Sequence, residues 1–327
     1  MPRDSSNPSR PSVALLVSGV AFVIAAWVGN FFVIKLGLRT VPPLRLLSFR
    51  MEIAGLVSIP IYLTRPRNPV TAEGAIRKKT WRDLWPLLYL GFFSTVVNMG
   101  GYVIGLNYTT VGHAGLITGL GPVFILLFAW SQGLESLLPM SVFGVLFAFT
   151  GAGILSAEHS MAFRSGTLKG DLIVLTGTLG FSTYTVLGKR VAKKFNPSEM
   201  IACSYFVGAI FFLPIAIHQA LLLTRTAAWG AIQWTGWFAI FYTALVSAVA
   251  AYLVYFWALR YVAASRLSAI LYMNPVATAV LGVWLLHDPV TWNLVAGGTL
   301  VLVGIYTIEA GHRRNAESQV MFYKNSK

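Results

Sequence analysis

The chain has 327 residues, of which 56% are hydrophobic and only 11% charged, and it carries a formal net charge of +14. A soluble globular domain carries roughly 25% charged residues because its surface contacts water, so this composition excludes an ordinary soluble domain. The Lys and Arg residues lie in short segments between apolar runs, which indicates a membrane protein and not a nucleic-acid binder with one basic patch.

Ten apolar stretches follow in chain order, each bounded by charged residues, Pro or Asn. A helix needs about 20 residues at 1.5 Å rise to cross the hydrocarbon core of a bilayer, and each stretch has that length or nearly so. The stretches are 13–34, 43–63, 84–106, 112–131, 139–156, 170–188, 198–219, 236–259, 265–286 and 290–308. They predict an all-α polytopic membrane protein of ten transmembrane helices. A disordered N-terminal tail over 1–11 and a polar C-terminal tail over 310–327 would flank the helices.

The positive charges orient these predicted helices. Cytoplasmic loops of membrane proteins carry more Lys and Arg than the loops on the other side. With the N-terminus in the cytoplasm, 18 of the 25 Lys and Arg residues fall on the cytoplasmic side and six on the opposite side, while Arg50 lies inside a span. The distribution predicts that both termini are cytoplasmic. We separately expect a multi-pass integral protein of a prokaryotic inner membrane.

The two halves of the chain match each other at a nearly constant offset of 153 or 154 positions. The matched pairs include Trp27 with Phe181, Pro43 with Pro197, Tyr102 with Tyr255, Pro122 with Pro275, Gly144 with Gly297 and Gly151 with Gly304. A constant offset across residues of such different kinds predicts two repeats. We place the first repeat at 12–157 and the second at 170–309, with a linker over 158–169.

Each repeat holds five predicted spans, and because five is odd the second repeat must enter the membrane from the opposite side. The loop charges agree, since the basic segment 65–82 of the first half corresponds to 223–233, which keeps only Arg225. Inverted repeats are typical of secondary transporters, in which alternating access exchanges the conformations of two halves. Channels and scaffold proteins can share the same symmetry.

Several segments also carry a family resemblance. They are Trp27 to Phe31, Pro43 to Arg50, Tyr108 to Phe124 leading into Glu135, Gly170 to Leu172, Tyr184 to Lys189, Ala258 to Tyr261, and Ser265 to Val276 leading into Asp288. With these segments the chain, over about residues 13–309, resembles the EamA type of the drug/metabolite transporter superfamily. One departure is His287-Asp288-Pro289 in place of the usual Gly-Glu pair. The resemblance implies a ten-helix bundle with a central cavity and small organic substrates that are often exported.

Prolines interrupt two predicted spans at equivalent positions. Pro122 follows Gly121, and Pro275 follows Asn274. A proline inside a helix removes a hydrogen bond and kinks the helix, and matched breaks in the two halves of a transporter point to a binding site at its central cavity. The alternative is a packing kink without ligand contact. Asn274 favours substrate binding, because its amide needs partners within the bilayer.

Glu52 is the one carboxylate well inside a predicted span, and Arg50 precedes it by two positions. Residues two apart point to different helix faces, so the two need not pair. A charge at the bilayer centre costs about 2.5–3.5 kcal/mol on insertion scales, so Glu52 must face the protein interior, be neutral, or bond to a neighbouring helix. Glu52 is a candidate for proton coupling or for binding a substrate amine, with an ion pair to an arginine such as Arg45 as the structural alternative. Arg50 is a candidate anion-binding group or a tie between helices.

Three further pairs of side chains share helix faces in the middle of predicted spans. They are Trp27 with Asn30, Asn98 with Tyr102, and Tyr252 with Tyr255. Such faces suit a cavity that stacks and hydrogen-bonds a small organic molecule, and ordinary packing between helices is the alternative. Gly144, Ala148 and Ala152 form a face of small residues, which predicts close helix packing.

These observations predict a secondary transporter that exports small organic metabolites, such as amino acids or related compounds. A flippase for lipids or lipid-linked amphiphiles could use the same bundle. An intramembrane enzyme needs paired acids, or a His with an acid or thiol, at membrane depth, and the five histidines lie at span ends, in loops or in the tail. We expect no catalytic residues, no cofactor, no metal site and no nucleic-acid partner. The expected partners are the bilayer and a small-molecule substrate, with protons as coupling ion and a homodimer left open.

Overall fold

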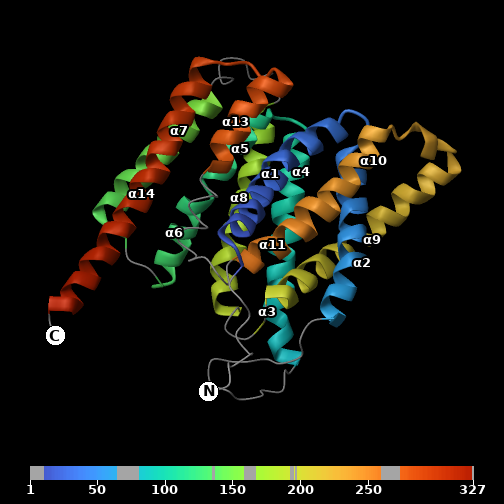
Figure 1. The fold of residues 1–327 in the computed structure, drawn as a ribbon. Helices are drawn as coiled ribbons and strands as arrows, with labels where there is room; N and C mark the ends of the chain where they lie inside the picture. The colour runs from blue at the N-terminus through green and yellow to red at the C-terminus, as the bar shows by residue number, and fades with distance from the viewer. Residues whose placement is uncertain are drawn as a thin grey trace.

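The computed structural model describes residues 11–64, 81–134, 137–157, 167–191, 195, 197–258 and 273–325. Every regular element in these ranges is a helix (Figure 1). Seven helical stretches of the described chain are long and apolar enough to cross a membrane, namely Val13–Gly37, Pro43–Thr64, Leu84–Leu106, Val111–Ser131, Ser198–Arg225, Trp234–Tyr255 and Trp292–Gly311. Shorter apolar helices cover Pro139–Leu155 and Asn274–Leu286. The prediction of an all-helical protein with many membrane-spanning helices is confirmed.

The first half of the chain folds into helices whose starts follow local sequence signals. Its elements are α1 (Val13–Gly37), α2 (Pro43–Thr64), α3 (Trp81–Gly91), the π-helix η1 (Phe92–Met99), α4 (Gly100–Leu106), α5 (Val111–Gly119), α6 (Gly121–Ser131) and α7 (Pro139–Ala157). The hydroxyl of Ser12 accepts the N–H of Leu15 at the start of α1, and Thr110 caps α5 in the same way. Helices α2 and α7 begin at a proline, whose fixed φ and missing N–H suit a first turn.

The second half follows a similar order. Its elements are α8 (Thr167–Val191), α9 (Pro197–Arg225), the short 3₁₀-helix η2 (Ala228–Ala231), α10 (Trp234–Phe241), the π-helix η3 (Tyr242–Ala250), α11 (Ala251–Ala258), α13 (Met273–Leu286) and α14 (Trp292–Asn325). Helix α14 continues to Asn325, so the segment that we expected to be a polar tail from 310 onward is helical through that residue. The predicted tail over 1–10, the basic loop 65–80, linker residues 158–166 and span residues 265–272 lie outside the described residues.

Two π-helices lie at matched places in the two halves. Helix η1 continues α3 into α4, and η3 continues α10 into α11. Shifting 92–99 by the offset of 153 gives 245–252, which overlaps η3 over most of its length. A π-helical turn is wider than an α-helical turn, occurs mainly as a short insertion within α-helices, and is frequent at functional sites. Both insertions therefore indicate that a functional site could lie along these helices.

Helices α7 and α14 pack against each other through glycines (Figure 1). A Cβ atom built on Gly144 would lie 2.6 Å from the carbonyl oxygen of Gly304, and one built on Gly297 would lie 2.6 Å from the carbonyl oxygen of Gly151. Gly144 thus faces Gly304 while Gly151 faces Gly297, so the two helices are antiparallel. The close packing predicted for the small-residue face around Gly144 is present, because without Cβ atoms the two backbones can approach closely.

Helices α2 and α9 form a second antiparallel pair, on the side of the molecule away from α7 and α14 (Figure 1). Near one end of α2, Arg45 Nε donates to Gln219 Oε1 at 2.9 Å. Further along, a Cβ on Gly55 would lie 2.7 Å from the Cβ of Ala209. Residue numbers rise along α2 as they fall along α9, which defines the antiparallel direction.

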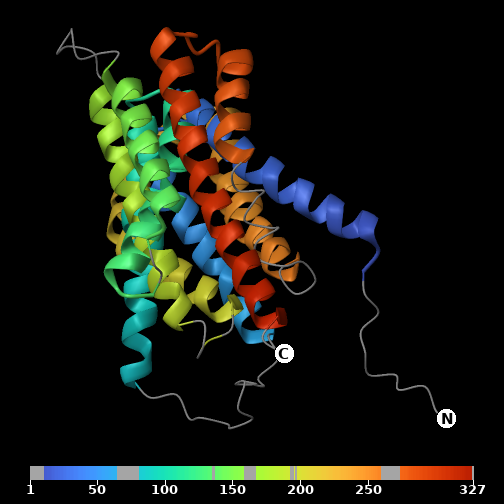
Figure 2. The same cartoon turned by 90° about the vertical axis from the view of Figure 1, so that its left-hand side faces the viewer.

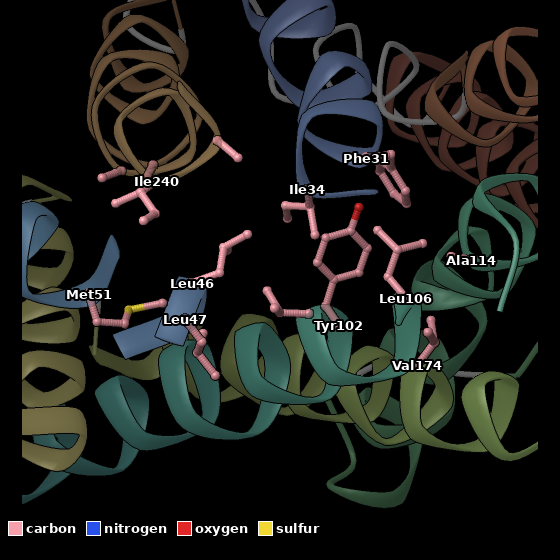
Figure 3. Packing of buried hydrophobic residues seen from close by; sticks show 14 of the residues in the cluster. Phe31, Ile34, Leu46, Leu47, Met51, Tyr102, Leu106, Ala114, Val174 and Ile240 are labelled. Atoms are coloured by element: carbon pink, nitrogen blue, oxygen red, sulfur yellow. The ribbon is translucent and has the colours of Figure 1, made fainter. Parts of the chain in front are cut away.

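The main apolar core lies where α1, α2, α4 and α10 converge. Ile34, Leu46, Leu47 and Met51 are fully buried there. Figure 3 shows the ring of Tyr102 beneath α1, with its hydroxyl directed toward that helix. The first turns of α1 stand apart from the other helices (Figure 2), and their side chains are exposed. The fold therefore surrounds its centre with helices from both halves of the chain.

Candidate functional site

The centre of the bundle contains a buried guanidinium. Arg50 on α2 is only 1% exposed. Its Nη2 donates to the carbonyl oxygen of Thr243 in η3 at 3.2 Å and contacts Met99 Sδ at 3.8 Å. Its Nη1 is buried without a hydrogen-bond partner in the described part of the chain, and no described carboxylate forms a salt bridge with it. Nη2 of Arg50 thus links α2 to η3, while Nη1 is a donor without a partner among the described residues.

Tyrosines from three helices lie near this guanidinium. Tyr102 of α4, Tyr205 of α9 and Tyr252 of α11 all lie within electrostatic range of Arg50. Tyr102 is 6% exposed, and its hydroxyl interacts with the side chain of Asn30, a buried residue of α1. Neither the hydroxyl nor Asn30 Oδ1 has any other hydrogen-bond partner among the residues that the structure describes. Several polar atoms with unused hydrogen-bonding capacity therefore lie in the interior near Arg50.

An aromatic group adjoins the tyrosines. The ring of Trp27 on α1 lies 5.3 Å from the ring of Tyr252 and 5.4 Å from that of Tyr255, measured between centroids. The indole N–H of Trp27 donates to the carbonyl oxygen of Ser247 at 3.3 Å. Trp27 comes from the first half of the chain and both tyrosines from the second, so the structure brings these three predicted site residues together.

The π-helix η3 is the common anchor of this site. Its backbone carbonyls accept the Arg50 bond at Thr243, the Trp27 bond at Ser247, and a bond from the Tyr205 hydroxyl to Ala248 at 3.3 Å. The shift from α-helical to π-helical hydrogen bonding changes which carbonyls are available to side chains. Helices α1, α2 and α9 are thereby all tied to the segment between α10 and α11.

Other predicted site residues lie elsewhere. The backbone of Asn98 in η1 packs against Gly177 and Gly180 of α8. Glu52 makes no ion pair with Arg45, which donates to Gln219 instead. Oε1 of Glu52 is buried and has no hydrogen-bond partner within the described ranges, so the ion pair with Arg45 is not formed.

The predicted helix breaks lie at the contact between α5, α6 and α13. Helix α5 ends at Gly119 and α6 begins at Gly121, with Pro122 in its first turn. The hydroxyl of Ser182 donates to the carbonyl oxygen of Gly121 at 3.2 Å. Pro275 lies in the first turn of α13, and its ring packs against Gly119. Oδ1 of neighbouring Asn274 is buried and has no hydrogen-bond partner among described residues.

A second polar cluster connects the ends of several helices and was not predicted from the sequence. Asp171 at the start of α8 accepts a hydrogen bond from the Thr109 hydroxyl and pairs with His113 Nδ1 at 3.1 Å. Lys35 Nζ donates to the carbonyl oxygens of Leu106 and Thr109 at 2.8 and 2.5 Å.

Asp288, in the loop before α14, extends this cluster. Its Oδ2 accepts the N–H of Gly112 at 3.0 Å, and the carboxylate lies within electrostatic range of Lys35. The cluster thus joins α1, α5, α8 and the α13–α14 loop at one end of the bundle. Its contacts are distant in sequence, so only the resemblance of the segments around Asp171 and Asp288 to a family pointed to these positions.

The residues at the centre are suited to binding a small ligand. A fixed cation, phenolic hydroxyls and an amide can hold a polar ligand, and the aromatic rings offer a surface for its apolar part. Among the residues that the structure describes, no group of three or more His, Cys, Asp and Glu side chains could hold a metal ion.

Comparison with known proteins identifies relatives over nearly the whole chain. The model of the EamA-like transporter family matches twice, at residues 13–157 and 168–309. An uncharacterized transporter of Archaeoglobus fulgidus is 29% identical over 292 residues, covering 88% of this chain and 96% of the relative. The uncharacterized transporter YvbV of Bacillus subtilis is 27% identical over 290 residues, covering 88% of each chain.

A solved crystal structure shares the fold. It superposes with a TM-score of 0.57 at 21% sequence identity, and the alignment covers 93% of this chain and 99% of the other. The uncharacterized inner membrane transporter YedA of Escherichia coli is a further relative, 23% identical over 259 residues and 78% of each chain. The named relatives are transporters of bacteria and archaea, and none of these names describes an enzyme.

Proposed function

The chain belongs to the EamA-like transporter family, and from that premise we propose that it is a secondary carrier that exports small organic metabolites, such as amino acids or related compounds. Membership makes it an integral membrane transporter with a small-molecule substrate and lipid surroundings. The observation that carries the proposal further is the central site, where one cation, several tyrosines and Trp27 converge from both halves. Such a mixed polar and aromatic interior suits a small amphipathic molecule.

We propose alternating access between two inverted repeats, 12–157 and 170–309, as the transport mechanism. The contacts of the glycines support it. The offset of 153 converts Gly144 into Gly297 and Gly304 into Gly151, so the contact of Gly144 with Gly304 becomes the contact of Gly297 with Gly151. A helix that packs antiparallel to its own repeat equivalent requires a two-fold axis across the helices, and such an axis inverts one repeat relative to the other.

The pair of α2 and α9 supports the same proposal independently. With the offset of 154, Gly55 corresponds to Ala209, and the two residues are in contact. A residue that touches its own repeat equivalent lies near a two-fold axis. Inverted repeats of this kind allow the two halves to exchange conformations, so that a central site opens to one side and then to the other.

Ten transmembrane helices with both termini in the cytoplasm complete the proposed topology. The seven long apolar stretches, the two shorter apolar helices and α8 supply the ten spans. The excess of Lys and Arg on the side of the termini sets the orientation. The cluster around Asp171 then lies on the non-cytoplasmic side, where it joins the outer ends of α1, α5 and α8.

Glu52 is the proposed proton-coupling residue, because this half-buried carboxylate lies in a membrane span and its buried Oε1 makes no hydrogen bond in the described structure. A carboxylate in that setting can take up and release a proton as access alternates. In proteoliposomes, Glu52→Gln should abolish accumulation driven by a pH gradient and leave exchange without a gradient in place. Gradient-driven transport that survives the substitution would exclude Glu52 as the coupling residue. A homodimer remains a proposal, which the mass of the detergent-solubilised protein would test.

The deciding experiment for the function is transport by the purified protein in proteoliposomes. Efflux and uptake of a panel of labelled amino acids and related metabolites are measured with and without a pH gradient, against empty liposomes. The proposal expects saturable movement of at least one metabolite. Scrambling of a fluorescent lipid without movement of any metabolite would replace the carrier by a flippase.

A further inference from the structure

We infer that the substrate carries a carboxylate and that Arg50 binds it through the unused side of its guanidinium. This inference rests on the proposed transport function and deepens it, because it names the chemical class of the substrate and the residue that selects it.

An arginine keeps its charge in proteins, so a fully buried guanidinium within a membrane protein needs compensation. Charged residues within membrane spans pair with one another or with backbone carbonyls, and they mark substrate pathways. Arg50 has one backbone carbonyl and one sulfur as partners and no carboxylate among the described residues. Its positive charge is therefore only partly balanced by the protein itself.

The acidic side chains of the described chain form no ion pair with Arg50. Asp171 is held by Thr109 and His113 in the cluster at the helix ends. Asp288 accepts the N–H of Gly112. Glu52 follows Arg50 by two positions, which places it on a different face of α2, and no hydrogen bond joins the two. Glu199 on α9 is also buried, and no salt bridge joins it to Arg50. Among the described residues no carboxylate therefore pairs with Arg50, and a substrate carboxylate would complete the site.

The donors of Arg50 are divided in a way that suits such a ligand. Nη2 is occupied by the carbonyl oxygen of Thr243, which fixes the plane of the guanidinium against η3. Nη1 is buried and unused. A planar guanidinium binds a carboxylate with strong charge-assisted hydrogen bonds, and a guanidinium that is already oriented loses little freedom on binding. The Tyr102 hydroxyl, which lies beside Asn30, is a further donor near Arg50.

The second repeat has no charged equivalent of Arg50. The equivalent of Arg50 in the second half, at the offset of 154, is Ser204, whose hydroxyl donates to the carbonyl oxygen of Met200 within its own helix. One cation at the centre matches one anionic group on the substrate. Beside it, the rings of Trp27, Tyr252 and Tyr255 form an aromatic surface. The substrate class is therefore a small carboxylate with an apolar or aromatic remainder, which includes amino acids and simple monocarboxylates.

Binding to the purified protein in detergent tests the inference. The probes are matched acids and amides: L-leucine with L-leucinamide, L-phenylalanine with L-phenylalaninamide, and 3-phenylpropanoate with 3-phenylpropanamide. A ligand that binds the folded protein raises its thermal midpoint in proportion to the logarithm of concentration over Kd. We expect at least one acid to bind about tenfold or more tightly than its amide. Equal binding of acid and amide throughout, or no binding of any acid at millimolar concentrations, would overturn the inference.

Variants then assign the preference to Arg50. Arg50→Gln should abolish the preference for the acid and leave amide binding within about twofold, whereas Arg50→Lys should retain part of the preference, because it keeps the charge. Arg45→Gln is the matched control, since it removes an arginine from the same helix that is bonded to Gln219. An equal loss of acid and amide binding in Arg50→Gln would show that the residue is only a tie to η3. If Arg50→Gln does not fold, the comparison of acids with amides on the unmodified protein decides.

The two proposals fail in different ways. If acids bind but no metabolite of the panel crosses proteoliposomes, the carrier function is wrong and the anion site stands. If metabolites are transported but acids and amides compete equally, the carrier function stands and the anion site is wrong.

Discussion

Replacing a glycine at the crossing of α7 and α14 tests the packing on which the repeat proposal depends. The Cβ atom of a Gly144→Ala variant would lie 2.6 Å from the carbonyl oxygen of Gly304, whereas ordinary contacts begin at 3.4 Å. The two helices must therefore separate locally by about 0.8 Å, the difference between these distances. The obstacle is backbone, which has no rotamer by which to move away.

The expected magnitude follows from two opposing terms. Overpacking a well-packed contact costs about 1–3 kcal/mol. Replacing glycine by alanine within a helix stabilises that helix by up to about 1 kcal/mol, as measured in water. The first term exceeds the second because the contact is against backbone, so Gly144→Ala should destabilise the protein by up to about 2 kcal/mol. Gly153→Ala is the matched control on the same helix, because nothing described lies within 4 Å of its Cβ position.

The assay is the thermal midpoint of the detergent-solubilised variants, followed by the loss of monodisperse protein after heating. We expect Gly144→Ala to melt below the parent and Gly153→Ala to melt at or above it. Gly297→Ala, at the repeat equivalent of Gly144, meets the Gly151 oxygen at the same 2.6 Å and should be lowered by a similar amount. Equal midpoints for Gly144→Ala and Gly153→Ala would refute the close contact, and a normal midpoint for Gly297→Ala would refute its symmetry.

Two further predictions concern the cluster at the helix ends and the topology. Asp171→Ala should lower the thermal midpoint by an amount equivalent to about 3 kcal/mol, because it leaves Thr109 and His113 without their buried acceptor. The control is Thr176→Ala on the same helix, an exposed residue whose printed hydrogen bond stays within that helix, and equal midpoints would show that the cluster contributes nothing. Cys203 is the single cysteine, so in a Cys203→Ala background a cysteine introduced at Arg39 should react with an impermeant maleimide added to intact cells. A cysteine that reacts only after permeabilisation would reverse the proposed topology.

The sequence predicts the helices well where a physical requirement acts on many residues at once. A bilayer demands about 20 apolar residues per span, and the predicted starts at 13, 43 and 139 coincide with the starts of α1, α2 and α7. Proline at the first helical position explains why the latter two could be located without the structure. The continuation of α14 to Asn325 was missed, because a polar segment that follows a span carries no apolar pattern from which to predict a helix.

The central site was predictable only in part. Arg50, Trp27 and Tyr252 stood out because a charge, an indole or a phenol is conspicuous in an apolar run. Tyr205 was missed, because its repeat equivalent is Met51 and the comparison of halves gave it no support. The π-helical form of η3 leaves no recognisable signature in the sequence, since it depends on backbone hydrogen bonds and on the side chains that pack around them. Yet η3 provides the carbonyls that orient Arg50, Trp27 and Tyr205.

The two halves match where equivalent helices pack against each other and differ at the centre, which fits the proposed mechanism. If the halves exchange conformations, the contacts between equivalent helices must serve in both states, and equivalent residues on the two sides are then required to match. The glycines of α7 and α14 meet that requirement. Ligand contacts have no such constraint, because one substrate has one polar end. The centre accordingly retains Tyr102 and Tyr255 as equivalents but places Arg50 opposite Ser204. In the proposed mechanism, a symmetric frame around an asymmetric centre would let one bound carboxylate remain on Arg50 while access passes from one side of the membrane to the other.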